Sequence, residues 1–107
     1  MDRLSEEYRK LRENCPAHVL LYQVGTFYKI MFDDAHKLAV VLGLKLFVTG
    51  EAASPVPVCG FPKSGLDKYI GKLVRAGYSV AVWNQVKSED GTVRREAGEV
   101  IRCSKAI

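Results

Sequence analysis

The sequence predicts an α/β (α+β) fold in which one mixed β-sheet is surrounded by about three helices. Segments with helical periodicity alternate along the chain with short runs rich in β-forming residues. The length of 107 residues, with 48% hydrophobic and 26% charged side chains, is sufficient for a buried core and is typical of a globular protein. We therefore expect residues 1–107 to form a single domain.

Three helices are expected from apolar side chains that repeat at helical spacing. The first covers about residues 3–14. The second begins at the acidic residues 33–34, which suit a helix N-terminus, and ends at Gly43, which suits a helix C-terminus. The third follows residues 64–67, which resemble a capping box, and has the strongest periodicity in the chain. Its apolar stripe consists of Leu66, Tyr69, Ile70, Leu73 and Val74.

Strands are expected where β-branched and aromatic residues gather between turn residues. The strand expected at residues 56–59 contains Pro57, which cannot donate a ladder hydrogen bond. This proline therefore indicates an edge strand or a partial strand. A turn at Gly25-Thr26 separates the first two strands, and residues 50–55 form a loop. The expected strands cover about residues 19–24, 27–32, 44–49, 56–59, 79–86 and 100–103.

The second expected strand suggests the sharpest functional hypothesis. Because side chains alternate between the two faces of a strand, its more apolar set should face the core and the other set should face outward. The apolar set is Tyr28, Ile30 and Phe32, and the outward set is Phe27, Lys29 and Met31. An exposed Phe after a glycine turn suits an apolar wedge that enters the DNA minor groove between base steps. The alternative is that Phe27 packs under the loop of residues 50–55.

A second candidate site is a basic stripe on the outer face of the third helix. Lys68, Lys72 and Arg75 are spaced i, i+4, i+7 and could lie along phosphates, although an ordinary solvated helix face has the same pattern. The net charge of +4 permits an anionic partner but does not require one.

Other classes of function find no support in the sequence. It contains no P-loop, G-x-S-x-G or H-E-x-x-H motif, so we do not expect an enzyme. The spacing of Cys15, Cys59 and Cys103, and of His18 and His36, does not suit disulfides or zinc, so neither a metal nor another cofactor is expected. We expect a cytoplasmic protein without a membrane partner. No apolar run is long enough to span a bilayer, and the charged N-terminus does not resemble a signal peptide.

Three stretches, in the same order, resemble the MutS DNA mismatch repair family. Residues 19–35 read VLLYQVGTFYKIMFDDA, residues 57–62 read PVCGFP and residues 67–86 read DKYIGKLVRAGYSVAVWNQV. The resemblance implies the N-terminal mismatch-recognition domain, a mixed sheet surrounded by helices. It implies double-stranded DNA, mismatched or not, and other mismatch-repair proteins as partners. The family's ATP site lies in a later domain and is not expected here, whether this is a stand-alone relative or a fragment.

The hallmark of this family is Phe-x-Glu, in which the Phe wedges beside the mispaired base from the minor groove and the Glu contacts that base. Phe27 matches the Phe, and Lys29 occupies the Glu position. Lysine only donates hydrogen bonds and is attracted to every phosphate. The resemblance therefore implies weak, salt-sensitive DNA binding with doubtful mismatch discrimination. A protein–protein interaction module that uses an exposed patch of Phe27 and Met31 stays open as the alternative, and so does the oligomeric state.

Overall fold

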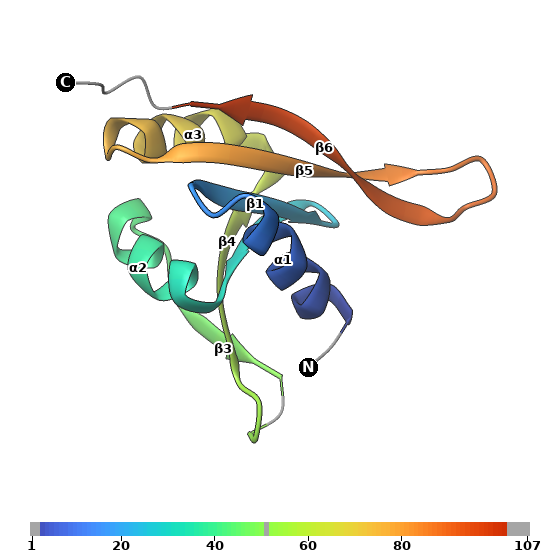
Figure 1. Cartoon of the computed structure of the whole chain (residues 1–107), viewed down its shortest axis with the longest axis horizontal. Coiled ribbons are helices and arrows are strands. Elements are labelled where there is room, and N and C mark those ends of the chain that lie inside the picture. The colour runs from blue at the N-terminus through green and yellow to red at the C-terminus, as the bar shows by residue number, and fades with distance from the viewer. Residues whose placement is uncertain (1–2, 51, 103–107) are drawn as a thin grey trace.

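The computed structural model describes residues 3–50 and 52–102. Six strands form one sheet in the order β3-β4-β2-β1-β5-β6, and three α-helices within the described residues pack on it (Figure 1). The helices are α1 (Arg3–Asn14), α2 (Phe32–Leu42) and α3 (Leu66–Arg75), with a short 3-10 helix η1 (Lys63–Gly65) before α3. The strands are β1 (His18–Val24), β2 (Phe27–Met31), β3 (Phe47–Thr49), β4 (Val56–Pro62), β5 (Ser79–Lys87) and β6 (Val93–Ile101).

The sheet is mixed, as the sequence predicts. β1 lies in its interior, antiparallel to β2 and parallel to β5, and the β2–β4, β3–β4 and β5–β6 pairs are antiparallel. β5 pairs with β1 as far as Trp83 and then continues with β6 alone, so the β5–β6 hairpin extends past the body as an arm (Figure 1). The turn between β1 and β2 lies near the base of this arm, because Gly25 is hydrogen-bonded to Gln85.

Each face of the sheet carries its own apolar layer. β1 supplies both layers, since Leu20 and Leu21 point to opposite faces and neither is exposed. One layer lies under α2 and α3 and includes Tyr28, Ile30 and Phe61. The layer under α1 consists mainly of Tyr8, Leu20, Tyr22, Met31, Val56 and Val58. The face of β2 opposite to Tyr28 is therefore only partly open to solvent.

The covering by α1 corrects the prediction for the end of β2. Met31 is not outward-facing but buried, at 5% exposure, because α1 closes that face of the sheet where β2 ends. Phe32 does not continue the strand into the other core. It begins α2 at φ 61°, a strained conformation for a bulky side chain, and its ring lies 6.1 Å from that of Tyr8.

Three further expectations about individual elements are wrong in detail. β4 is not an edge strand, since it lies between β2 and β3 and reaches Pro62. Pro57 is tolerated because it pairs only toward β3, beyond the last β2–β4 pair at Val58. α3 begins without a side-chain cap, because η1 leads directly into it. β6 starts at Val93, much earlier than expected, while Cys103 lies outside the described residues.

Candidate functional site

The turn between β1 and β2 presents Phe27 to solvent. Val24 and Phe27 are cross-strand partners, so only Gly25 and Thr26 form the loop. A positive φ of 63° at Gly25, followed by a residue without positive φ, fits the type II′ hairpin turn, which takes glycine at its first central position. Phe27 is 45% exposed whereas Tyr28 is 2% exposed, so the predicted alternation holds at this end of the strand.

Phe27 does not pack under the loop of residues 50–55. That loop joins β3 to β4 at the beginning of β4, whereas Phe27 pairs with Pro62 at the opposite end of β4. The competing interpretation of Phe27 as a residue covered by this loop is therefore wrong.

Exposure alone does not distinguish Phe27 from other apolar side chains. Val40 on α2 is 84% exposed, and Phe47 and Val48 on β3 are 57% and 66% exposed. Phe27 differs in its surroundings, because it directly follows a two-residue turn and lies beside cationic side chains. These surroundings, rather than hydrophobic exposure, indicate a site.

Lys29 is the next side chain on the same face as Phe27. It is half-buried and lies opposite Tyr22 on β1 and Gly60 on β4. A Cβ at Gly60 would come within 3.5 Å of the Lys29 Cγ and 2.9 Å of the Tyr28 carbonyl oxygen, so the absence of a side chain leaves room for the lysine stem. Among the described residues no carboxylate pairs with Lys29, which leaves its ammonium group available to a ligand.

Two cations near the turn were missed by the sequence analysis. The backbone N–H of Lys63 donates to the Thr26 carbonyl oxygen at 2.7 Å, so this exposed lysine begins beside the turn. Arg95 comes from β6, and its guanidinium lies 4.5 Å from the centre of the Tyr22 ring. Only strand pairing brings these residues to the turn, and no local pattern in the sequence indicates it.

The basic stripe of α3 lies on the other face of the sheet from Phe27 and Lys29. α3 packs on the layer that contains Tyr28, whereas Phe27 and Lys29 alternate with Tyr28. The stripe is also partly engaged within the protein: the Lys72 Nζ donates to the Leu42 carbonyl oxygen at 3.4 Å. The structure therefore separates the five residues predicted for DNA binding into two groups, which are Phe27 and Lys29, and Lys68, Lys72 and Arg75.

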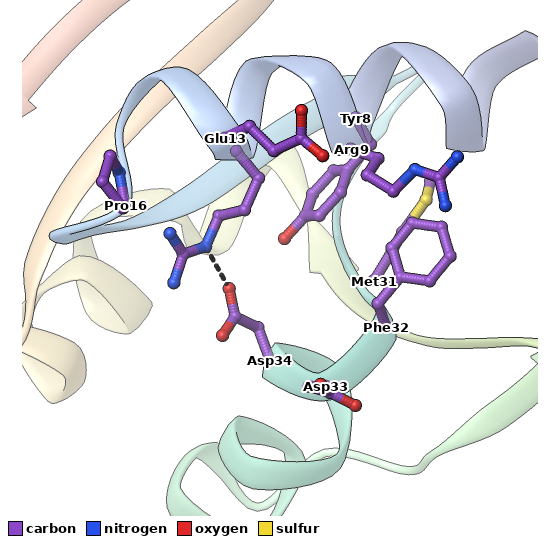
Figure 2. A pocket seen from close by; sticks show the side chains of 9 residues that line it. Tyr8, Arg9, Glu13, Pro16, Met31, Phe32, Asp33 and Asp34 are labelled. Carbon is purple, nitrogen blue, oxygen red and sulfur yellow. Dashed lines mark hydrogen bonds and ion pairs between the residues drawn. The ribbon is translucent and has the colours of Figure 1, made fainter.

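A pocket of about 560 Å³ lies between α1 and the start of α2 (Figure 2). Its charged lining residues are Arg9, Arg12, Glu13, Asp33 and Asp34. The Arg12 Nε donates to the Asp34 Oδ2 at 2.6 Å, and this ion pair raises the pKa of Arg12. Met31 lines the pocket from the end of β2 opposite to Phe27. The pocket is therefore separate from the turn, and its mixed charges do not favour a polyanion.

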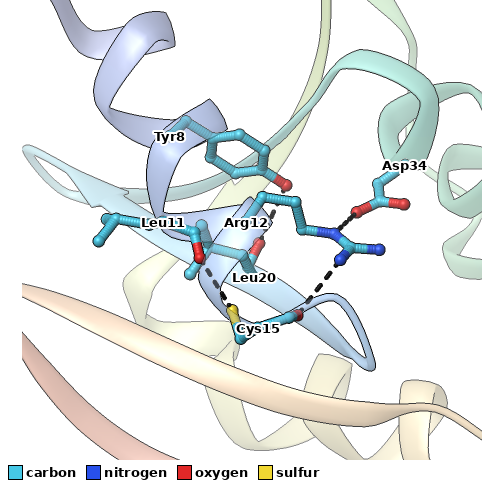
Figure 3. A network of polar contacts seen from close by, with 6 residues as sticks. All are labelled: Tyr8, Leu11, Arg12, Cys15, Leu20 and Asp34. Carbon is cyan, nitrogen blue, oxygen red and sulfur yellow. Dashed lines mark hydrogen bonds and ion pairs between the residues drawn. The ribbon is translucent and has the colours of Figure 1, made fainter.

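Polar contacts around this pocket hold α1 in place, and one of them reaches the sheet at β1 (Figure 3). The Tyr8 hydroxyl donates to the Leu20 carbonyl oxygen at 3.4 Å, and the Arg12 Nη1 donates to the Cys15 carbonyl oxygen at 3.2 Å. The Cys15 thiol in turn donates to the Leu11 carbonyl oxygen at 3.1 Å. These contacts explain the charged and polar groups beside the pocket as part of the packing of α1.

The thiols and acidic side chains of the described residues form no reactive or metal-binding cluster. Cys59 is buried in the core, and burial raises the pKa of its thiol to about 11, which makes it a poor nucleophile at neutral pH. Among residues 3–50 and 52–102, no group of three His, Cys, Asp or Glu side chains could hold a metal ion. Likewise, no helix in those residues has the length and apolar character needed to cross a membrane.

Comparison with known families decides what kind of domain this is. The family model described as MutS domain I matches residues 2–104. The chain belongs to the MutS domain I family. The mixed sheet with helices on both faces is consistent with a MutS domain I fold.

Several bacterial proteins named DNA mismatch repair protein MutS are similar to this MutS domain I. The identity is 39% over 102 residues for Fusobacterium nucleatum, covering 92% of this chain and 11% of the relative. It is 37% over 101 residues for Chlorobium limicola, with the same coverage, and 37% over 105 residues for Rhodopirellula baltica, covering 94% of this chain and 12% of the relative. The chain thus spans 11 to 12% of the length of these MutS relatives.

Proposed function

We propose that this protein binds double-stranded DNA through the β1–β2 turn, with Phe27 as a minor-groove wedge and Lys29 beside it. The observation that carries the proposal is the position of Phe27, exposed directly after a two-residue turn and next to Lys29 and Lys63. Membership of the MutS domain I family supports it, because the relatives are named DNA mismatch repair proteins. The proposed binding needs no cofactor or catalytic group from this chain.

The charges around Phe27 support a polyanionic partner. Lys29 and Lys63 both lie at the turn, and the whole chain carries a net charge of +4. An aromatic ring supplies stacking energy with a base, and lysines supply contacts to phosphates that weaken with salt. We therefore propose salt-sensitive binding, with poor discrimination between mismatched and matched duplexes because Lys29 cannot accept a hydrogen bond from a base.

The stripe of Lys68, Lys72 and Arg75 stays a predicted phosphate-binding surface. Because α3 covers the opposite face of the sheet, a duplex bound at Phe27 would reach the stripe only around the end of the sheet, past Lys63. We therefore assign the wedge to Phe27 and Lys29, and expect changes in the α3 stripe to have smaller effects. A protein-binding patch of Phe27 and Met31 is not proposed, since Met31 is buried.

The first prediction tests the wedge with Phe27→Ala. We expect this substitution to weaken binding to a mismatched duplex by about tenfold or more, which corresponds to the loss of one base–aromatic stacking contact. Binding is measured by fluorescence anisotropy with matched and mismatched duplexes at low and moderate salt. Thermal melting of the variant should stay close to wild type, because nearly half of the Phe27 side chain is already exposed.

Phe47→Ala is the matched control, since Phe47 is an equally large side chain, 57% exposed, on the edge strand β3 away from the β1–β2 turn. This control should leave DNA binding unchanged. The proposal fails if the wild-type protein does not bind DNA at low salt, or if Phe27→Ala and Phe47→Ala bind equally well.

A further inference from the structure

The turn that carries Phe27 is held by side chains from three strands. The N–H of Gly25 donates to the Gln85 Oε1 at 2.9 Å, and the Gly25 carbonyl oxygen accepts from the Gln23 Nε2 at 2.9 Å. The Oε1 of Gln23 accepts from the backbone N–H of Gln85 at 2.7 Å. The backbone N–H and the carbonyl oxygen of Gly25 are thus both bound by glutamine side chains, which are themselves linked.

Arg95 completes this network from β6. Its Nε donates to the Gln23 carbonyl oxygen at 2.7 Å, and its Nη2 reaches the Gln85 Oε1 at 3.4 Å. The guanidinium carbon also lies 4.5 Å from the centre of the Tyr22 ring, which is a cation–π contact. On the other side of the turn, the Thr26 carbonyl oxygen accepts from the Lys63 N–H.

These side-chain contacts lie beyond the backbone pairing of β1 with β5, while Gln85 and Arg95 are cross-strand partners on β5 and β6. Gln23 is 6% exposed although it is polar, and Gln85 lies beyond the last β1–β5 pair at Trp83. A two-residue type II′ turn closes without side-chain assistance from a third or fourth strand. The additional hydrogen bonds restrict the backbone of Gly25, which comes directly before Thr26 and Phe27.

We infer that Gln23, Gln85 and Arg95 are positioning residues that hold the Phe27 wedge rigid for insertion into DNA. This inference rests on the proposed function. A ring that enters a base stack loses less conformational entropy if its backbone is already fixed, so the cost of unstacking is offset more fully. A loosened turn would still bring Lys29 and Lys63 near phosphates but would insert the ring less often.

Gln85→Met and Gln85→Glu test the inference as a pair. Methionine keeps the length of the side chain but removes the acceptor for Gly25 and Arg95, whereas glutamate keeps an acceptor oxygen. In the free protein, we expect Gln85→Met to accelerate hydrogen exchange of the Gly25 amide by about tenfold, as for the loss of one hydrogen bond, and Gln85→Glu to stay near wild type. Exchange is followed by NMR on the full chain.

The second measurement uses a duplex with 2-aminopurine next to a mismatch, because its fluorescence rises when the base is unstacked. At saturating protein, Gln85→Met should lower the fluorescence increase to less than half of the wild-type value, toward that of Phe27→Ala, while Gln85→Glu should retain it. A general loss of structure would instead reduce the melting temperature and all binding together. Arg95→Met and Arg94→Met form a second pair, with the same loss of charge and with Arg94 bound to Glu96 instead of the turn.

The possible outcomes separate the two proposals. If the Gly25 amide exchanges its hydrogen at the wild-type rate in Gln85→Met, the positioning role is overturned, whatever the result with DNA. If the Gly25 amide exchanges faster but the 2-aminopurine fluorescence stays at the wild-type level, the rigidity of the turn does not serve insertion of the ring. The inference is then equally overturned. If the wild-type protein gives no signal that depends on Phe27, the proposed function fails, while the exchange experiment still decides whether these residues hold the turn. If Gln85→Met does not fold, the Arg95 and Arg94 variants decide both measurements.

Discussion

Lys29 is the residue at which this chain departs from the pattern that its family resemblance implies. It faces the same side as Phe27, and Gly60 leaves room for its stem. A lysine here adds attraction to any phosphate and removes the acceptor that a carboxylate would offer to a base. In the proposed complex with DNA, this single side chain should therefore set the balance between affinity and discrimination.

Lys29→Glu should lower the affinity for matched DNA and raise the ratio of mismatched to matched binding. The slope of log affinity against log salt should also become shallower by about one, as for the loss of one phosphate contact. Anisotropy titrations over a range of salt concentrations measure all three quantities.

Lys45→Glu is the control for net charge, since Lys45 is exposed and follows α2, away from the turn. It should reduce affinity no more than a distant charge does and should leave the ratio unchanged. An unchanged ratio in Lys29→Glu would mean that position 29 does not contact the base.

The side chains of β2 show how far residue-level reasoning reaches. Alternation correctly predicted that Phe27 is exposed and that Tyr28 and Ile30 are buried. It failed at Met31, because strand periodicity tells which residues share a face but not whether a distant helix covers that face.

At the scale of elements, α3 is the most predictable part of the chain. Its apolar stripe was expected from spacing alone, and Leu73 in that stripe is fully buried. Its start was not predictable from the Ser64-x-x-Asp67 pattern, because η1 supplies the first turn and leaves Gly65 at the N-cap position.

Leu73→Ala should destabilise the protein by about 2–5 kcal/mol, because it leaves a cavity between α3 and the sheet. Urea unfolding followed by circular dichroism measures this change. Val40→Ala on α2 is the matched control: Val40 is 84% exposed, so its truncation should change the free energy of unfolding by no more than about 0.5 kcal/mol. Similar effects of the two substitutions would contradict the assigned core.

Strands were predictable where they are buried and less so where they are exposed. β1 is an apolar run with two buried faces, and its expected range differs from the structure by one residue. β6 was mostly missed, because its sequence VRREAGEVI is largely polar. It is an edge strand of the sheet and pairs only with β5. An exposed edge strand carries little hydrophobic signal.

The apolar layer under α1 gives the whole molecule a measurable response to alkaline pH. Burial raises the pKa of Tyr22 to about 12 from an ordinary value of 10.0, and burial likewise raises the pKa of Tyr8. Between pH 10 and about pH 12, Tyr22 keeps its proton in the folded state, whereas the unfolded state has released it. The stabilising contribution is therefore complete below about pH 10 and is lost as the pH rises toward 12.

The free energy of unfolding, measured with urea at a series of pH values, should thus fall steeply above pH 10. Tyr22→Phe removes one of the ionisable groups and should make this fall shallower. A slope that is identical in the variant and the wild type would show that Tyr22 does not stay protonated in the folded protein.

The sequence by itself determined the fold class, the three helices and the buried central strands, since each depends on periodicity or on turn residues within one segment. It predicted that Phe27 points outward, but it left open whether the loop of residues 50–55 covers the ring. Only the tertiary structure decided that Met31 is covered, that β4 is an interior strand and that the α3 stripe lies on the opposite face from Phe27. It also brought Gln85 to the backbone N–H of Gly25, and Arg95 to Gln85. The physical reason is that strand pairing joins residues far apart in the chain, and no local pattern encodes which strands become neighbours.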